Sequence, residues 1–266
     1  MQRTLDSQAL HFFRIFLSLK IAAPYLFPLG APSIPYIALV LVASLPRYYL
    51  SGLVGILILS AKELVETWPL SINHNALEMV ILALLCLYPS ESKGDSPKTY
   101  PSCNELIQWL MVSVWVYSGI HKLLDSYYWN GEFFALEVLS DASGLGHKLG
   151  LLIQQVGIAL PIQAPLACCS VLPFANSPAF AGFLLLLAWA TVLTEIILPW
   201  GLFLPKVREY TLLALFIFQA NIAYFSGEID FAFTAFAILL LFVPRIARVA
   251  YPIHIGLMLV VQPWLT

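Results

Sequence analysis

Charge is the scarcest property of this 266-residue sequence. Only 11% of the residues are charged, whereas 60% are hydrophobic and the mean hydropathy is +0.85. Soluble domains carry roughly a quarter charged residues, so this composition excludes an ordinary water-soluble domain. The net charge of −2 provides no basic field for nucleic acid. We therefore predict a chain whose main surroundings are the lipid bilayer and which binds no nucleic acid.

Cysteine and aspartate patterns that would indicate metal chemistry are also absent from the sequence. The four cysteines, Cys86, Cys103, Cys168 and Cys169, include no CxxC pair and no metal-binding spacing. We interpret them as small buried apolar residues. No aspartate-rich run of the DDxxD or DxDD type occurs, which counts against the machinery of the familiar soluble terpene cyclases.

What the sequence has in abundance is long apolar runs, which favour membrane helices over short barrel strands. Helices are predicted at about residues 8–29, 34–67 with a break at 46–47, 73–88, 104–124, 147–161, 179–204, 210–225, 230–243 and 249–262. Residues 90–102 are predicted to form a polar loop, and residues 125–147 a loop with one interfacial piece. The predicted fold is an all-α integral membrane protein, a bundle of about 7–9 membrane segments, some broken or re-entrant. No segment is polar enough for a second domain, so one transmembrane domain is expected over residues 1–266.

Basic residues predict the orientation of this bundle. They gather in two turns, at residues 206–208 and 245–248, which are expected to face the cytoplasm. Arg14 and Lys20 lie inside the first apolar run, whereas a signal peptide has its charges before that run. The first helix is therefore expected to stay in the protein, and the compact loops favour a bacterial inner membrane.

Lys122 and Glu195 also lie within apolar runs, where ionisable side chains are costly and often functional. Pro199 follows Glu195 by four residues and is predicted to kink the helix beside the carboxylate. Lys122 follows Ser118 by one helical turn, and Asp125 is a possible ion-pair partner for it. A lysine at a helix end is also compatible with a membrane-edge anchor, so both interpretations stay open.

Amide and imidazole side chains add further candidates. His74 is at the start of a helix, where Asn73 is a suitable N-cap. Gln219 and Asn221 are in the middle of an apolar helix, where amides usually bond to a neighbouring helix.

Taken together, these segments resemble a known family. The run YSGIHKL at residues 117–123, followed by WNG at 129–131, is similar to the aromatic–small–Gly–x–x–Lys–Leu…Trp–x–Gly signature of the horizontally transferred transmembrane domain. This domain is the membrane part of vitamin K-dependent gamma-carboxylase. Asn-His at 73–74, Glu-x-x-x-Pro at 195–199 and Pro-x-x-Arg at 205–208 match in the same order. The resemblance covers approximately residues 8–245, and similarity to the DoxX-like proteins is weaker.

The resemblance implies a helical bundle with a lipid-filled internal pocket. In the carboxylase, the lysine that matches Lys122 deprotonates vitamin K hydroquinone before oxygenation, and the histidine that matches His74 supports it. The catalytic candidates are therefore Lys122, His74 and Glu195. The expected substrate-binding residues are Trp115, Tyr117, Ser118, Gly119, His121, Trp129, Gln219 and Asn221.

Three departures from the carboxylase limit this transfer of function. Gln219 occupies the position of a histidine, and His121 the position of a second lysine. The large extramembrane domain that binds protein substrates is also missing, so carboxylation of a protein's glutamates is not expected.

Three functions follow as hypotheses. The first is acid–base catalysis by Lys122 and His74 on an isoprenoid or quinone-type lipid, with a reduced quinone and O₂ as possible reactants. The second is a membrane terpene cyclase acting on a prenyl diphosphate, with Mg²⁺ held by carboxylates such as Asp125, Glu228 and Asp230. The third is a non-enzymatic, DoxX-like partner subunit. The sequence identifies neither the lipid nor a protein partner.

Overall fold

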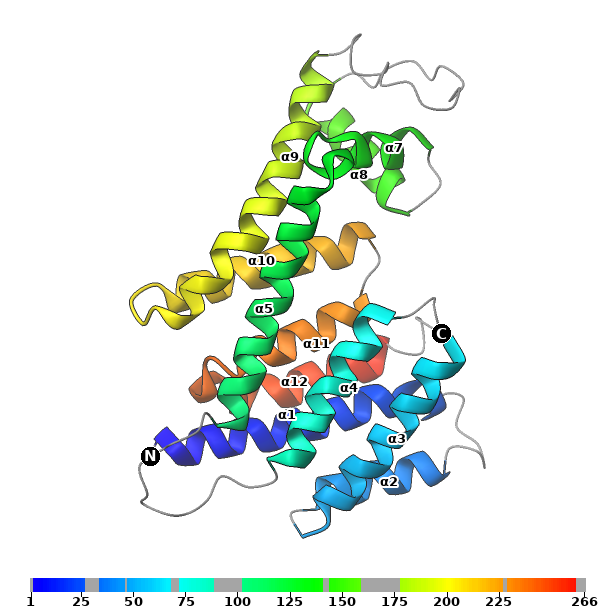
Figure 1. Cartoon of the computed structure of the whole chain (residues 1–266), viewed down its shortest axis with the longest axis vertical. Coiled ribbons are helices and arrows are strands. Elements are labelled where there is room, and N and C mark those ends of the chain that lie inside the picture. The colour runs from blue at the N-terminus through cyan, green and yellow to red at the C-terminus, as the bar shows by residue number, and fades with distance from the viewer. Residues whose placement is uncertain are drawn as a thin grey trace. The chain divides into compact units, whose positions relative to one another are not determined.

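The structure is a computed structural model that describes residues 2–26, 34–45, 47–67, 72–88, 102–140, 144–158, 178–226 and 229–261. All regular elements of this part of the chain are helical, which confirms the all-α prediction (Figure 1). They are α1 (Gln2–Leu26), α2 (Ile34–Ser44), α3 (Tyr49–Thr67), α4 (Ile72–Leu87), α5 (Cys103–Leu124), α6 (Ser126–Trp129), α7 (Glu132–Ser140), α8 (Gly144–Gln155), α9 (Pro178–Ile197), η3 (Leu198–Phe203), α10 (Arg208–Ser226), α11 (Ile229–Leu240) and α12 (Pro244–Val261). The predicted polar loop at 90–102 lies almost wholly outside the described residues, and so does the stretch at 162–178, for which the sequence, with three prolines, predicts irregular structure.

The chain folds into two compact units. Unit 1 comprises residues 1–111 and 233–266, and unit 2 comprises residues 112–232. The single domain expected from the sequence stays a prediction.

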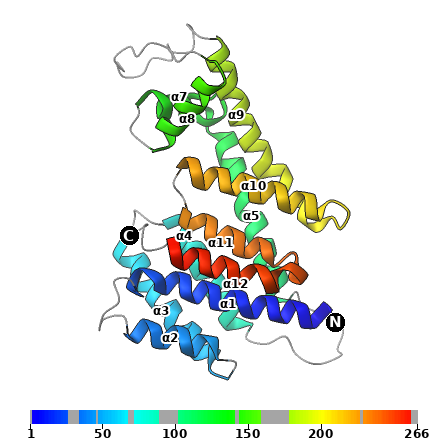
Figure 2. The ribbon, with the colours of Figure 1, turned by 180° about the vertical axis from the view of Figure 1, so that it is seen from behind.

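In unit 1, α1 packs against α12 and α2, and α3 packs against α2 and α4. Figure 2 shows α1, α11 and α12 as neighbouring helices of this unit. The face of α1 that carries Phe13, Phe16 and Leu17 is fully buried. Tyr251 of α12 is also fully buried, and its hydroxyl donates to the carbonyl of Ala237 on α11 at 2.7 Å. Apolar side chains at helical spacing therefore form the core of this unit.

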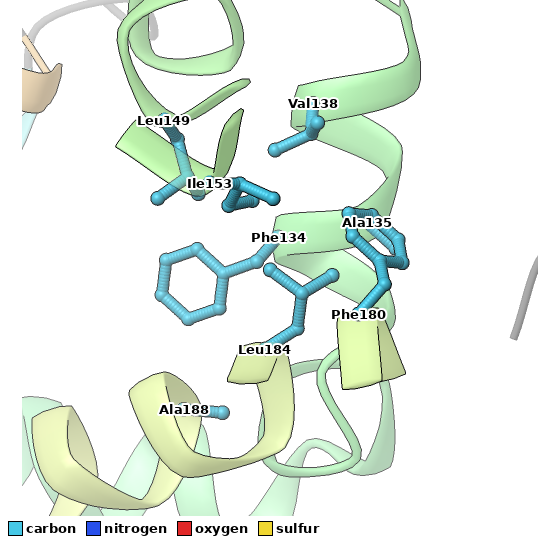
Figure 3. Packing of buried hydrophobic residues seen from close by; sticks show 8 residues of the cluster. All are labelled: Phe134, Ala135, Val138, Leu149, Ile153, Phe180, Leu184 and Ala188. Atoms are coloured by element: carbon cyan, nitrogen blue, oxygen red, sulfur yellow. The ribbon is translucent and has the colours of Figure 1, made fainter. Parts of the chain in front are cut away.

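In unit 2, the short helices α7 and α8 pack against the first half of α9. Their buried side chains form one apolar cluster (Figure 3), which consists of Phe134, Ala135, Val138, Leu149, Ile153, Phe180, Leu184 and Ala188. Gly131, with φ of +83°, precedes α7, and a Cβ there would lie 3.3 Å from the backbone of Leu184 and Leu185 on α9. Glycine is therefore favoured in this turn, because it adopts a positive φ readily and because a Cβ would have little space beside α9.

The region predicted as a loop at 125–147 is mostly helical. Asp125 caps α6, because its side chain accepts a hydrogen bond from the backbone N–H of Tyr127. Asn130 ends α6, and its side-chain oxygen accepts a hydrogen bond from the backbone N–H of Glu132 at the start of α7. Closely spaced caps and turns thus produce short helices where the sequence predicts a loop with one interfacial piece.

Pro199 changes the helix type at the end of α9. It has no N–H to donate to the carbonyl of Glu195, so the α-helix ends at Ile197 and the chain continues as the 3₁₀ helix η3. Arg208 then anchors the turn into α10, because its Nε donates to the carbonyl of Leu202 at 2.8 Å. The structure thus shows a change of helix type beside Glu195, and the predicted kink stays a prediction.

One helical segment in the described part of the chain is both long and apolar enough to span a membrane. It is Pro178–Phe203, with 26 residues and a mean hydropathy of 2.1. Only 22% of the residues in its most apolar window are buried, so it differs from the buried core helix of a soluble protein. Shorter apolar helices cover Tyr49–Lys62, Ala76–Leu87, Phe231–Leu240 and Val249–Val261. A bundle with many membrane crossings stays a prediction.

Candidate functional site

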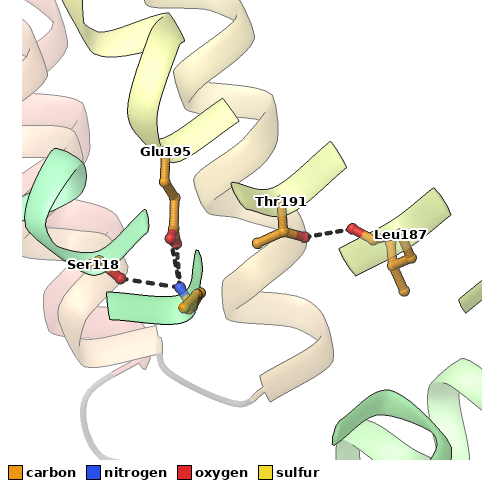
Figure 4. A network of polar contacts seen from close by, with 5 residues as sticks. Ser118, Leu187, Thr191 and Glu195 are labelled. Carbon is orange, nitrogen blue, oxygen red and sulfur yellow. Dashed lines mark hydrogen bonds and ion pairs between the residues drawn. The ribbon is translucent and has the colours of Figure 1, made fainter. Parts of the chain in front are cut away.

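The candidate site is an ion pair between α5 and α9 in unit 2. Lys122 Nζ lies 2.5 Å from Glu195 Oε1 and 2.6 Å from Oε2, so both carboxylate oxygens accept from one ammonium group. Figure 4 shows the carboxylate of Glu195 and the hydroxyl of Ser118 directed at the same lysine nitrogen. The Glu195 side chain is 4% exposed, and the Lys122 side chain is 24% exposed. The carboxylate is therefore enclosed, whereas the amine has one open side.

Gly119 brings the two helices close enough for this pair. A Cβ at Gly119 would lie 2.6 Å from Cγ1 of Ile196 and 3.0 Å from Cβ of Glu195. Contacts this short do not occur between carbon atoms, so α9 can approach α5 here only because residue 119 has no side chain. Lys122 follows Gly119 by three residues, on the same side of α5.

Two neighbours orient the lysine. Its ammonium donates to the Ser118 hydroxyl at 3.0 Å, one turn earlier on α5. It also lies 5.4 Å from the centre of the Tyr128 ring, within the range of a cation–π contact. These contacts, together with the ion pair to Glu195, fix the position of the ammonium group between α5 and α9.

Two further predicted residues of unit 2 are buried and carry polar atoms without hydrogen bonds. Trp115 is 3% exposed, and its indole N–H has no partner among the described residues. Gln219 on α10 is 0% exposed, and neither its amide nitrogen nor its amide oxygen has a partner there. Most buried polar groups in proteins are paired, so a polar ligand would relieve a real cost at these positions.

Four other predicted binding residues do not join the pair. Tyr117 is 71% exposed and His121 is exposed, and their rings are 6.3 Å apart on the outer side of α5. Asn221 is exposed, and its amide donates to the carbonyl of Ile217 in its own helix at 2.7 Å. Trp129 is half-buried and lies 6.2 Å from the ring of Trp189 on α9. The structure brings Ser118, Gly119, Lys122 and Glu195 together, but not these four residues.

The remaining predicted residues are His74 and the three carboxylates expected to hold Mg²⁺. His74 lies in α4, but its side chain is outside the described set, as is that of Asp230; Glu228 is not described at all. Asp125 is exposed and caps α6, so the partner of Lys122 is Glu195 rather than Asp125. Among the described residues, no group of three or more His, Cys, Asp or Glu side chains is arranged to hold a metal ion.

No family model, curated protein or solved structure matches the chain. The resemblance to the horizontally transferred transmembrane domain therefore rests on the four motifs in its sequence. It stays a prediction, and the geometry of the Lys122–Glu195 pair carries the functional argument.

Proposed function

We propose that this protein is a multi-pass membrane enzyme that performs acid–base chemistry on an isoprenoid or quinone-type lipid. The observation that carries this proposal is the Lys122–Glu195 pair, which joins an enclosed carboxylate to a partly open amine between two apolar helices. Ionisable groups inside a membrane segment are by default candidates for a functional site.

A membrane location is supported by helices that are apolar on both faces. The inner face of α12 carries Ala247, Tyr251 and Met258, which are fully buried. Its outer face carries Ile246, Val249, Ile253, Leu257 and Val260, each between 55% and 68% exposed. A helix that is hydrophobic all round belongs in a large core or in lipid. Similar outward residues on α9, namely Leu186, Leu193 and Ile197, extend this argument to unit 2.

The proposed chemistry begins with proton transfer inside the pair. A lysine acts as a base only as the neutral amine, and Glu195 is positioned to take the proton from the Lys122 ammonium. The N–H bond at Nζ breaks, an O–H bond forms on the carboxylate, and the total charge is unchanged.

The neutral amine then meets the substrate on its open side. A lipid hydroxyl within hydrogen-bond distance of Lys122 Nζ would give up its proton to the amine and become an oxyanion beside the new ammonium group. Glu195 is therefore assigned the role of proton acceptor, Lys122 that of base and counter-ion, and Ser118 that of a positioning residue.

The class of substrate is supported by the apolar surroundings of the Lys122–Glu195 pair, and the unpaired polar atoms of Trp115 and Gln219 lie in the same unit. A lipid with a long apolar tail and one or two oxygen atoms matches a site with few polar groups. The indole N–H of Trp115 donates only, whereas the amide of Gln219 both donates and accepts. A carbonyl or hydroxyl oxygen is suited to both residues.

The test compares Lys122→Met with Lys148→Met. Lys148 is a matched control because it lies in the same unit, donates to a backbone carbonyl and contacts the Tyr224 ring at 4.6 Å, but has no carboxylate partner among the described residues. Wild type and both variants are purified in mild detergent, their lipids are extracted and identified by mass spectrometry, and turnover is measured with that lipid class and O₂.

We expect wild type and Lys148→Met to retain a quinone or prenyl lipid and to consume it. Lys122→Met should lose turnover by a factor of about 100 or more, as is typical for removal of a general base. If Lys122→Met equals Lys148→Met in turnover, or if wild type carries only bulk phospholipid and turns over no lipid of this class, then Lys122 is an anchor and the proposal fails.

A further inference from the structure

Unit 1 contains a second lysine–glutamate pair, which lies deeper than the first. Lys20 occupies the buried face of α1, one turn after Phe16, and is 4% exposed. Its ammonium forms an ion pair with Oε1 of Glu78 on α4. Glu78 is also 4% exposed. Both charges therefore lie inside the apolar core of this unit.

A third helix completes the cluster. Thr234 of α11 is fully buried, and its hydroxyl donates to the same oxygen of Glu78 at 2.6 Å. The cluster thus joins α1, α4 and α11, which are far apart in the sequence. His254 of α12 contacts the same helix as Thr234, since its Nε2 lies 2.8 Å from the carbonyl of Phe233, the residue before Thr234.

Stability alone is a poor reason for such a cluster. A buried ion pair costs so much desolvation that well-packed apolar residues are often as stable or more stable in its place. Both side chains are almost completely enclosed, at 3% exposure for Lys20 and 6% for Glu78. The corresponding exposure of Lys122 in unit 2 is 24%. The cluster in unit 1 is thus too enclosed to receive a lipid, but a proton requires no open space.

We propose that Lys20, Glu78 and Thr234 form a proton-exchange site in the interior of unit 1, independent of Lys122. One proton moves between the Lys20 amine and the Glu78 carboxylate: an N–H bond breaks, an O–H bond forms, and the net charge stays zero. The Thr234 hydroxyl is suited to both states, because it donates to the carboxylate and can accept from the carboxylic acid. His254 supplies an additional proton-binding group, which contacts the helix that carries Thr234. Its Nε2 must donate to the carbonyl of Phe233, which leaves Nδ1 as the acceptor nitrogen of the neutral ring.

Among the side chains that the structure describes, no second basic group neutralises Glu78. The described basic and imidazole side chains on the helices packed against α1 and α4 are His11 and Arg14 on α1, Lys62 on α3, and Arg245 and His254 on α12. None of these hydrogen-bonds to Glu78, whose ion-pair partner is Lys20.

Infrared spectroscopy of the protein in lipid nanodiscs tests this site, because a neutral carboxyl group has a carbonyl absorption that an ionised one lacks. We expect wild type to have such a band, sensitive to D₂O, that disappears in Glu78→Gln and persists in Glu195→Gln. Lys20→Met should raise this band to the intensity of one complete carboxyl group, because a buried carboxylate without its counter-charge takes up a proton.

Thr234→Val provides a second test that keeps both charges in place. It should shift the band, since the carboxyl group loses one hydrogen-bond donor. A wild-type spectrum without a Glu78-dependent band, at every pH at which the protein stays folded, overturns the proposal. An unchanged band position in Thr234→Val also overturns it.

Discussion

Replacement of Gly119 with alanine should separate α5 from α9 and destabilise unit 2. The new Cβ would lie 2.6 Å from Ile196 Cγ1, 3.0 Å from Glu195 Cβ and 3.2 Å from the backbone nitrogen of Ile196. The first of these atoms can yield by a side-chain rotation, but the backbone nitrogen can yield only if α9 moves. Overpacking of this kind costs about 1–3 kcal/mol.

Gly182→Ala is the matched control for this change. Gly182 also lies inside a helix, α9, but nothing lies within 4 Å of a Cβ added there. Both variants gain about 1 kcal/mol of helix propensity, so this term cancels when they are compared. Gly119→Ala should therefore be less stable than Gly182→Ala by about 1–3 kcal/mol.

Unfolding in mixed micelles of mild detergent and sodium dodecyl sulfate, followed by tryptophan fluorescence, measures this difference. The Lys122–Glu195 pair depends on the same approach of the helices, so turnover should fall in Gly119→Ala and not in Gly182→Ala. Equal stability of the two variants would refute the close contact of α5 with α9, and the geometry of the pair with it.

Three further predictions use the same unfolding assay. Lys122→Met leaves the enclosed Glu195 carboxylate unpaired and should lower the free energy of unfolding by about 3–5 kcal/mol. Glu195→Gln leaves a lysine that can reach solvent, so it should cost less, about 1–3 kcal/mol. Equal losses of stability in the two variants would contradict the difference in burial. Gln219→Leu removes two unpaired buried polar atoms and should stabilise the lipid-free protein by about 1–3 kcal/mol. The same variant should retain less lipid. A loss of stability would show that the amide has a hydrogen-bond partner. Lys20→Met should lower the free energy of unfolding by about 3–5 kcal/mol, but the double variant Lys20→Met/Glu78→Leu should be nearly as stable as wild type. If the losses of the two single variants add up in the double variant, the result would argue against a direct pair.

The sequence predicts long apolar helices of this fold well and short helices poorly. The expected helix at 104–124 is α5, Cys103–Leu124, because a long apolar run between a polar start and a polar end leaves few alternatives. The helices α6 and α7 were missed because they depend on local caps at Asp125 and Asn130 rather than on a periodic pattern.

The sequence predicts Lys122 and Glu195 separately as site residues, but it does not predict that they form a pair. Lys122 and Glu195 are recognisable because each interrupts an apolar run, yet they are 73 residues apart, and no sequence spacing links them. Asp125 was the nearer carboxylate, and it is used instead as a helix cap. The sequence indicates Lys20 only as a charge within the first helix, because its partner Glu78 is 58 residues away.

The length of α9 and η3 has a consequence for the depth of the site in a bilayer. The twenty residues of α9 rise about 30 Å at 1.5 Å per residue, which equals the thickness of the hydrocarbon layer. If α9 crosses the bilayer as proposed, the 3₁₀ helix that follows it brings Trp200 to the level of the headgroups, where tryptophan is favoured. Under the same proposal, Glu195 lies about one turn below the membrane surface. A lipid that reacts there would keep its tail among the acyl chains and bring its oxygen atoms in from the headgroup side.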